Sequence, residues 1–168
     1  MQQKTVVELE GVNGERFILA GPGAGDQGVF LGTDVKGLYD PPVKAVYEEP
    51  GNWPGARYLN HRVQKREITF GVEIVDHRSE TWASRESVWR KAWAFDRDCK
   101  LYVTTMESGT RYLKLRLAES PEVSWFSDPN EYSVNRTVMV CVALDPYWYE
   151  DDAIFTAVTT LDTRFNPI

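Results

Sequence analysis

The sequence predicts a mainly β (α+β) protein, a β-sandwich or split barrel with one α-helix and one long extended arm. Residues 67–74 alternate apolar and polar side chains, which is the period of a half-buried strand. Residues 133–144 also alternate, but both faces are apolar beyond Val138, which is typical of a central strand. Trp82, Trp89 and Trp93 share the spacing of a helical face, so we expect a helix over about residues 82–96.

The chain opens with a predicted β-hairpin. Residues 5–10 and 16–20 flank a polar segment that contains Asn13-Gly14. This dipeptide favours a two-residue type I′ turn, because both central residues of that turn need positive φ.

Residues 21–61 are predicted to form an extended arm with brief strands. Glycine and proline clusters punctuate the segment, and short apolar stretches such as residues 29–31 and 45–47 lie between them. Connections of this length are usually functional or disordered. The scattered aromatic and aliphatic residues argue against disorder, so we expect the arm to be ordered by contact.

The predicted helix can begin at Ser79 or Thr81, either of which can cap it. Basic residues gather near its end, as the helix dipole favours. The three indoles are interpreted as core, since one short helix must dock to bury them. Residues 101–106 and 111–117 then form a hairpin around 107–110.

The remainder of the chain contains turns and one further strand. Residues 120–121 and 127–130 favour turns, the strand of residues 133–144 ends before Pro146, and residues 153–161 are expected to form another strand. There is no internal repeat.

The overall composition excludes several classes of protein. The 168 residues carry a net charge of −6, which disfavours a nucleic-acid-binding protein, and 42% hydrophobic residues suffice for a core. No apolar run approaches the ~20 residues of a membrane span, and the N-terminus lacks a signal-peptide pattern. Cys99 and Cys141 are expected to be free thiols.

No catalytic, cofactor-binding or metal site is predicted. Residues 23–28 lack the Lys-Ser/Thr ending of a phosphate loop, and residues 96–98 lack the pattern of a calcium loop. His61 and His77 stand in polar surroundings without a nucleophile, and no serine lies in a Gly-x-Ser-x-Gly motif.

Aromatic residues in predicted loops are the candidate functional residues. Tyrosine and tryptophan beside proline and glycine are typical of protein interfaces, and stacking of sugars is the other common use. Any one of them can also simply cover an end of the sandwich. The candidate interface residues are Trp53, Tyr58, Tyr147, Trp148 and Tyr149, with Phe126 as a further loop aromatic.

The order of these features resembles the distal tail protein (Dit) family of long, flexible-tailed bacteriophages. The likeness is to the version found as a minor tail protein in phages of mycobacteria and their relatives, and it covers about the whole chain. The segment that ends at Tyr149, an Asp-Pro-aromatic close after a Val-rich strand, is the most specific. The matching segments are Val12–Glu15, Leu38–Pro42, Pro54–Ala56, Arg66–Phe70, Val88–Trp93, Asp96–Leu101, Arg111–Leu117 and Ala143–Tyr149.

The resemblance implies a structural virion protein without enzymatic activity. It implies a homohexameric ring at the end of the tail, where the tail tube meets the tip, with tail tube, Tal-like tip and other minor tail proteins as partners. Genomic DNA would pass through the lumen without specific binding, and the negative net charge suits such a ring. The long arm would supply the interface between neighbouring copies.

The resemblance also implies a domain division. Residues 1–150 would form the ring-forming β domain, and residues 151–168 a linker or the start of a second β domain. Two alternatives remain: a carbohydrate-binding β-sandwich that uses Trp53 or Trp148 as a platform for host adsorption, and a hydrolase, for which no nucleophile–base pair is found.

Overall fold

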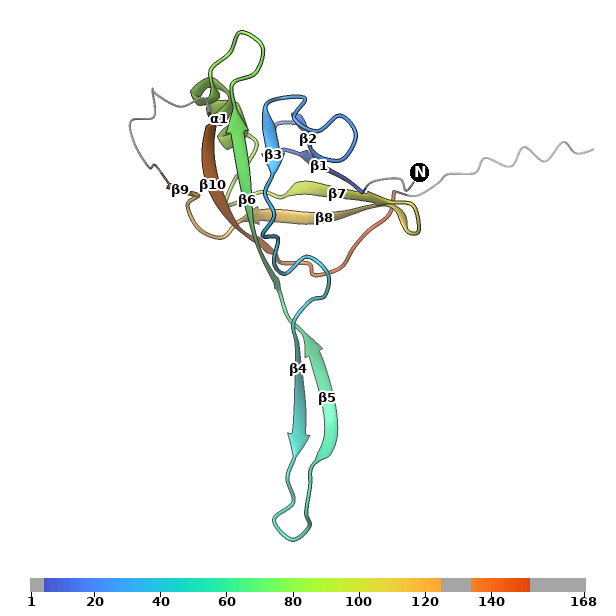
Figure 1. Ribbon diagram of the computed structural model, residues 1–168. Helices are drawn as coiled ribbons and strands as arrows, with labels where there is room; N and C mark the ends of the chain where they lie inside the picture. The colour runs from blue at the N-terminus through green and yellow to red at the C-terminus, as the bar shows by residue number, and fades with distance from the viewer. Residues whose placement is uncertain (1–4, 125–133, 152–168) are drawn as a thin grey trace, which may run out of the picture.

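A computed structural model describes residues 5–124 and 134–151, in which the chain forms β-strands and one helix (Figure 1). The elements in chain order are β1 Val6–Glu10, β2 Arg16–Ala20, β3 Val29–Leu31, β4 Val43–Glu48, β5 Arg57–Val63, β6 Arg66–Val75, α1 Trp82–Lys91, β7 Cys99–Thr105, β8 Gly109–Leu117, β9 Glu122–Ser124 and β10 Val134–Ala143.

The main sheet curls into a nearly closed barrel with the strand order β2-β1-β7-β8-β10-β6-β3, and all neighbours are antiparallel. The barrel is split at β10, which pairs with β8 near Cys141 and with β9 near Thr137. The loop after β2 closes part of the gap between β2 and β3, because the Gly25 amide donates to the Ile18 carbonyl at 2.8 Å. The predicted fold class is confirmed.

The two strands predicted from alternation form the longest ladder of the sheet. β6 and β10 pair along their whole lengths, from Val134 opposite Val75 to Ala143 opposite Arg66. The predicted apolar face of β6 is buried in the barrel, and β10 lies between neighbours rather than at an edge. The buried side chains of β6 are Ile68, Phe70, Val72 and Ile74.

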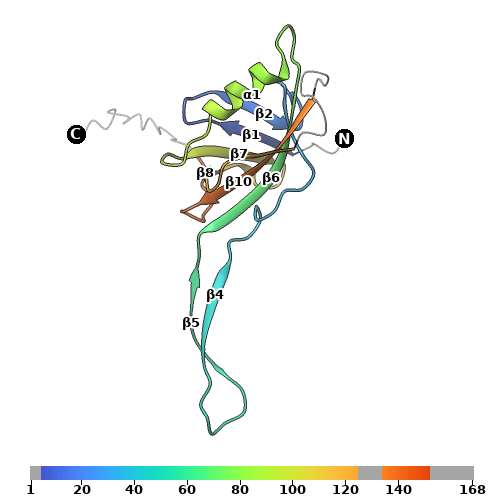
Figure 2. The same cartoon turned by 90° about the vertical axis from the view of Figure 1, so that its left-hand side faces the viewer.

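The helix closes one end of the barrel, as Figures 1 and 2 show. Its indoles lie in the core as predicted: Trp89 meets Phe17 edge-on at 5.1 Å between ring centroids, and Trp93 lies 6.0 Å from Phe70. Thr81 is the N-cap, and its side chain accepts a hydrogen bond from the Ser84 amide.

The helix ends at Lys91, so the predicted end at residue 96 is wrong. The reason is tertiary hydrogen bonding beyond the last turn. The Ala92 carbonyl accepts from the Val12 amide at 2.9 Å, and the Ala94 carbonyl accepts from the Leu117 amide at 3.0 Å. A helix through residue 96 would need the Ala92 carbonyl as the acceptor for the residue 96 amide, and Val12 binds that carbonyl instead, although Trp93 still reaches the core.

The first hairpin forms as predicted, but its turn is not type I′. Gly14 has φ +82°, whereas Asn13 is not among the described residues with positive φ. The Gly14 amide donates to the Gly11 carbonyl at 3.0 Å, and the Gly11 amide donates to the Glu15 carbonyl at 2.8 Å, so the loop spans five residues. Gly11 packs against the helix end, where an added Cβ would lie 2.5 Å from the Ala92 Cβ.

Some predicted features lie outside the described residues. These are the turn at residues 127–130, Phe126, the strand at residues 153–161 and nearly all of the segment 151–168.

Candidate protein interface

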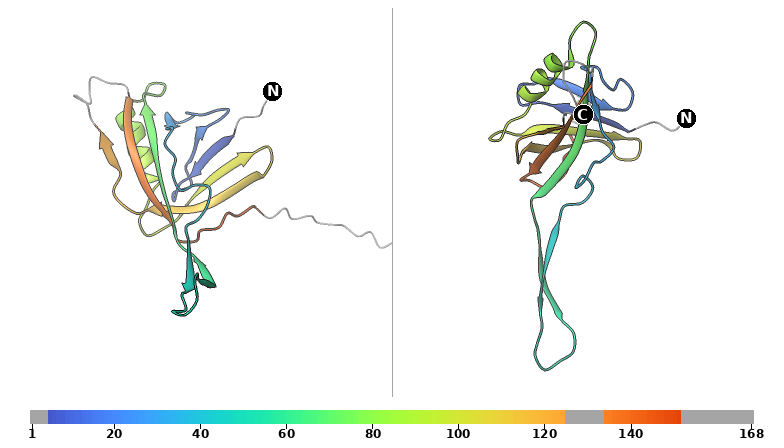
Figure 3. Two further views of the ribbon diagram at one scale, coloured as in Figure 1. Left: turned by 60° about the horizontal axis from the view of Figure 1, so that its bottom comes forward. Right: turned by 60° about the vertical axis from the view of Figure 1, so that its left-hand side comes forward.

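The predicted arm is largely a two-stranded ribbon that projects from the barrel (Figures 1 and 3). Among the described strands, β4 and β5 pair only with each other, and they form a sheet separate from that of the barrel. β3, which was expected to belong to the arm, instead pairs with β6 in the barrel. The projecting part is therefore shorter than residues 21–61.

One face of the ribbon is aromatic and aliphatic. The cross-strand pairs there are Val43 with Val63 and Tyr47 with Tyr58. The two tyrosine rings lie 6.2 Å apart, and the Tyr58 hydroxyl is hydrogen-bonded to Nδ1 of His61. Tyr47 is 59% exposed and Tyr58 is 52% exposed. An isolated two-stranded hairpin is marginally stable in water, so this face is suited to being covered by another surface.

The root of the ribbon is held by Arg66, a buried cation at the start of β6. Its guanidinium donates to the carbonyls of Leu38, of Tyr39 at 3.1 Å and of Pro146 at 2.7 Å. It also lies over the Trp148 ring, 5.8 Å from the centroid. Burial lowers the pKa of Arg66 from its ordinary value, but the group stays charged near neutral pH. Arg66 thus joins the segment that leads into the ribbon to the segment after β10.

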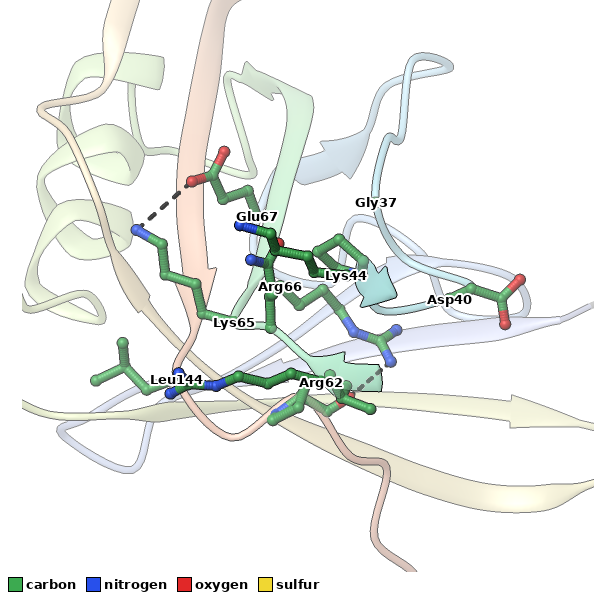
Figure 4. A pocket seen from close by; sticks show the side chains of 12 residues that line it. Gly37, Asp40, Lys44, Arg62, Lys65, Arg66, Glu67 and Leu144 are labelled. Atoms are coloured by element: carbon green, nitrogen blue, oxygen red, sulfur yellow. Dashed lines mark hydrogen bonds and ion pairs between the residues drawn. The ribbon is translucent and has the colours of Figure 1, made fainter. Parts of the chain in front are cut away.

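A cleft of about 1030 Å³ lies beside Arg66 at the root of the ribbon (Figure 4). Its charged lining residues are Lys44, Arg62, Lys65, Arg66, Asp40 and Glu67. Lys65 forms an ion pair with Glu67 at 3.6 Å. Within the described residues, no ion pair engages Lys44 or Arg62.

The predicted interface residues fall into two groups, which the structure does not bring together into one site. Trp53 lies in the turn between β4 and β5 and is 77% exposed, and Tyr58 lies on β5. Residues 147–149 lie on the barrel after β10: Tyr147 is exposed, whereas Trp148 is partly buried against the core and Tyr149 stacks on Tyr112 at 5.8 Å.

The contacts of residues 148 and 149 are those of barrel packing. The Tyr149 and Tyr112 backbones exchange two hydrogen bonds, of 2.8 and 2.9 Å. Trp148 lies under Arg66 and against the core, and it also lines a small pocket together with Leu38, Tyr39 and Val103. The prediction from sequence missed Tyr47, Lys44, Arg62 and the role of Arg66. The signal that could have indicated a strand is the alternation over residues 43–48, which places Val43, Ala45 and Tyr47 on one face and Lys44, Val46 and Glu48 on the other.

The described part of the chain contains neither a cluster of metal ligands nor a membrane-spanning helix. No group of three or more His, Cys, Asp or Glu side chains there could hold a metal ion. Among the same residues, no helix has the length and apolar character needed to cross a membrane. Cys99 and Cys141 are buried free thiols, as predicted, and burial raises the pKa of both.

Comparison with known proteins identifies close relatives. No family model matches the chain. Over 167 residues, it is 64% identical to the minor tail protein Gp27 of Mycobacterium phage D29 and 62% identical to that of Mycobacterium phage L5. Each alignment covers 97% of this chain and 49% of the relative, so the chain spans about half the length of these proteins.

Solved structures of phage proteins share the fold. The Dit protein of phage SPP1, described as a paradigm of the hub adsorption apparatus in phages that infect Gram-positive bacteria, matches with a TM-score of 0.58 at 11% identity over 88% of this chain and 53% of its own. A chain of the phage P2 baseplate, in its activated conformation with Ca, matches with a TM-score of 0.63 at 11% identity over 88% of this chain and 46% of its own. The resemblance seen in the sequence is confirmed.

Proposed function

Because this chain is a homologue of the mycobacteriophage minor tail proteins over nearly its whole length, we propose that it is a structural component of the phage virion. In this proposal it forms a homohexameric ring at the distal end of the tail and joins the tail tube to the tip. The fold supports this role, since it is the fold of the SPP1 Dit protein and of a phage baseplate chain.

The observation that carries the proposal is the exposed apolar face of the β4–β5 ribbon. A closed ring needs a heterologous interface, in which one surface of a subunit meets a different surface of the next. The ribbon projects beyond its own barrel, so none of the described residues covers its Tyr47 and Tyr58 face, and a second chain can bury it. The ribbon of each copy therefore lies on the barrel of its neighbour, with Trp53 at the far end of the contact.

The partners in this proposal are other proteins of the tail. The ring binds the tail tube on one side and the tip proteins on the other, and the exposed Tyr147 is a candidate contact for one of them. DNA passes through the lumen, where the net charge of −6 limits adhesion. The protein has no enzymatic activity. In the same proposal, residues 1–150 are the ring-forming domain, and residues 151–168 are a linker or the start of a second β domain.

The test is the mass of the protein in solution, measured by light scattering coupled to size exclusion. We expect a particle of about six copies. Replacing Tyr47 and Tyr58 by Ser should yield monomers, because it removes the apolar surface that the interface buries. The control is Met106→Ser, since Met106 is a more exposed apolar residue (77%) outside the ribbon.

Two results would contradict the proposal. One is a wild-type protein that stays monomeric up to millimolar concentration, both alone and with purified tail tube protein. The other is a ring that persists in the double tyrosine variant, which would place the interface elsewhere.

A further inference from the structure

Positive charge is concentrated in and around the ribbon. Residues 36–66 contain six of the 19 basic residues and three of the 25 acidic residues, a local charge of +3. The rest of the chain then holds 13 basic and 22 acidic residues, a charge of −9. Two copies of this chain are therefore complementary in charge, provided that the ribbon of one meets the barrel of the other.

The second face of the ribbon contains an unfavourable pair of like charges. Lys44 on β4 lies directly opposite Arg62 on β5. Like charges directly opposite each other on antiparallel strands destabilise the pairing. The next pairs on this face are Val46 with Asn60 and Glu48 with Arg57, and Glu48 forms its ion pair with Arg57 at 2.9 Å, not with Lys44 or Arg62. Lys44 and Arg62 are both exposed, so the pair is open to a group of opposite charge from outside the ribbon.

Lys44 and Arg62 both line the cleft of about 1030 Å³ at the root of the ribbon (Figure 4). Its buried wall is Arg66, which is 2% exposed. The Nε of Arg66 has no hydrogen-bond partner among the described residues. Buried polar atoms are usually paired, and this N–H is one of seven buried side-chain atoms without a protein partner among the described residues. A cleft of this size has room for a short peptide segment.

We infer that the cleft is a carboxylate-binding site that takes an acidic segment from the barrel of a second copy of this chain. Lys44 and Arg62 neutralise the incoming carboxylates. Two parts of the ribbon then act differently. Its apolar face is covered by the neighbouring copy, and its basic root sets the register between the two copies. This inference rests on the proposed assembly of copies into a ring. It adds that ion pairs between the ribbon cations of one copy and carboxylates of the next align the two.

The test compares self-association of three forms of the full chain by sedimentation velocity at 50 and 500 mM NaCl. The double variant Lys44→Gln, Arg62→Gln removes both cations, and the control Lys91→Gln, Arg97→Gln makes the same change of charge at exposed positions outside the ribbon. We expect wild-type association to weaken in high salt. The ribbon variant should associate at least about tenfold more weakly than wild type at low salt. The control variant should associate as tightly as wild type.

A competition experiment tests the chemistry directly. A hexaglutamate peptide should dissociate the wild-type assembly, whereas hexaglutamine at the same concentration should not. Circular dichroism of the ribbon variant should match wild type, because removing like charges relieves repulsion and does not disturb packing.

The failures of the two proposals are distinguishable. If the wild type and the ribbon variant assemble equally well, the proposal of a carboxylate-binding site is wrong and the proposal of a ring is retained. If wild type is a monomer under all conditions, the ring is wrong and the second copy is excluded as the occupant.

Discussion

Replacing Arg66 by Met should destabilise the protein strongly, because one buried guanidinium satisfies three carbonyls from two distant segments. The acceptors belong to Leu38, Tyr39 and Pro146, which lie 28, 27 and 80 residues away along the chain. A hydrogen bond from a charged donor contributes about 1.5–3 kcal/mol. Some of this is offset because burying the cation is costly, so we expect a loss of about 3 kcal/mol in the free energy of unfolding.

Urea denaturation followed by fluorescence measures this loss, with Arg136→Met as the control. Arg136 also forms a short ion pair, with Glu73 at 2.9 Å, but its side chain is 68% exposed. An exposed pair contributes about 0–1 kcal/mol, so the control should stay close to wild type. Limited proteolysis should cut Arg66→Met first within residues 36–42, where two carbonyls lose their donor. If the two variants unfold within about 0.5 kcal/mol of each other, Arg66 does not hold the root of the ribbon.

Two further perturbations test the packing of the barrel. Gly11→Ala should lower the free energy of unfolding by about 2 kcal/mol, because the new Cβ would lie 2.5 Å from the Ala92 Cβ. The control Gly51→Ala, where the space is open, should leave it almost unchanged. Urea denaturation measures both, and equal effects would contradict the packing of Gly11 against the helix end. Burial raises the pKa of the Cys141 thiol and, together with a hydrogen bond to Glu10, that of Tyr102, each to about 12. Since the unfolded state then ionises first, the free energy of unfolding should fall as the pH rises from about 9 to about 12. Cys141→Ala should reduce that slope, and an unchanged slope would show that the thiol does not contribute.

Strands could be predicted where apolar and polar side chains alternate with a period of two residues. In β6 every second residue is a large aliphatic or aromatic side chain, and a strand with that pattern can bury only one face. The same reasoning placed β10 in the middle of the sheet, since apolar residues on both faces need cover on both sides.

The errors arose where distant contacts override local preference. The residues after Lys91 are acceptable helix formers, but the Ala92 carbonyl is bound by Val12. Asn13-Gly14 favours a tight turn by itself, but Gly11 must first fit against the helix end. Nothing in the local sequence around Arg66 indicates a buried cation with three carbonyl partners, because those partners are set by the fold.

The junction between β5 and β6 has a mechanical consequence. Only Gln64 and Lys65 separate the two strands, so the ribbon continues almost directly into the barrel. A pull on the ribbon is therefore transmitted along the axis of β6, parallel to its ladder with β10. In this shear geometry the hydrogen bonds of the ladder share the load and must break together, whereas a pull across the strands would open them one at a time. The barrel is therefore arranged to resist tension applied through the ribbon.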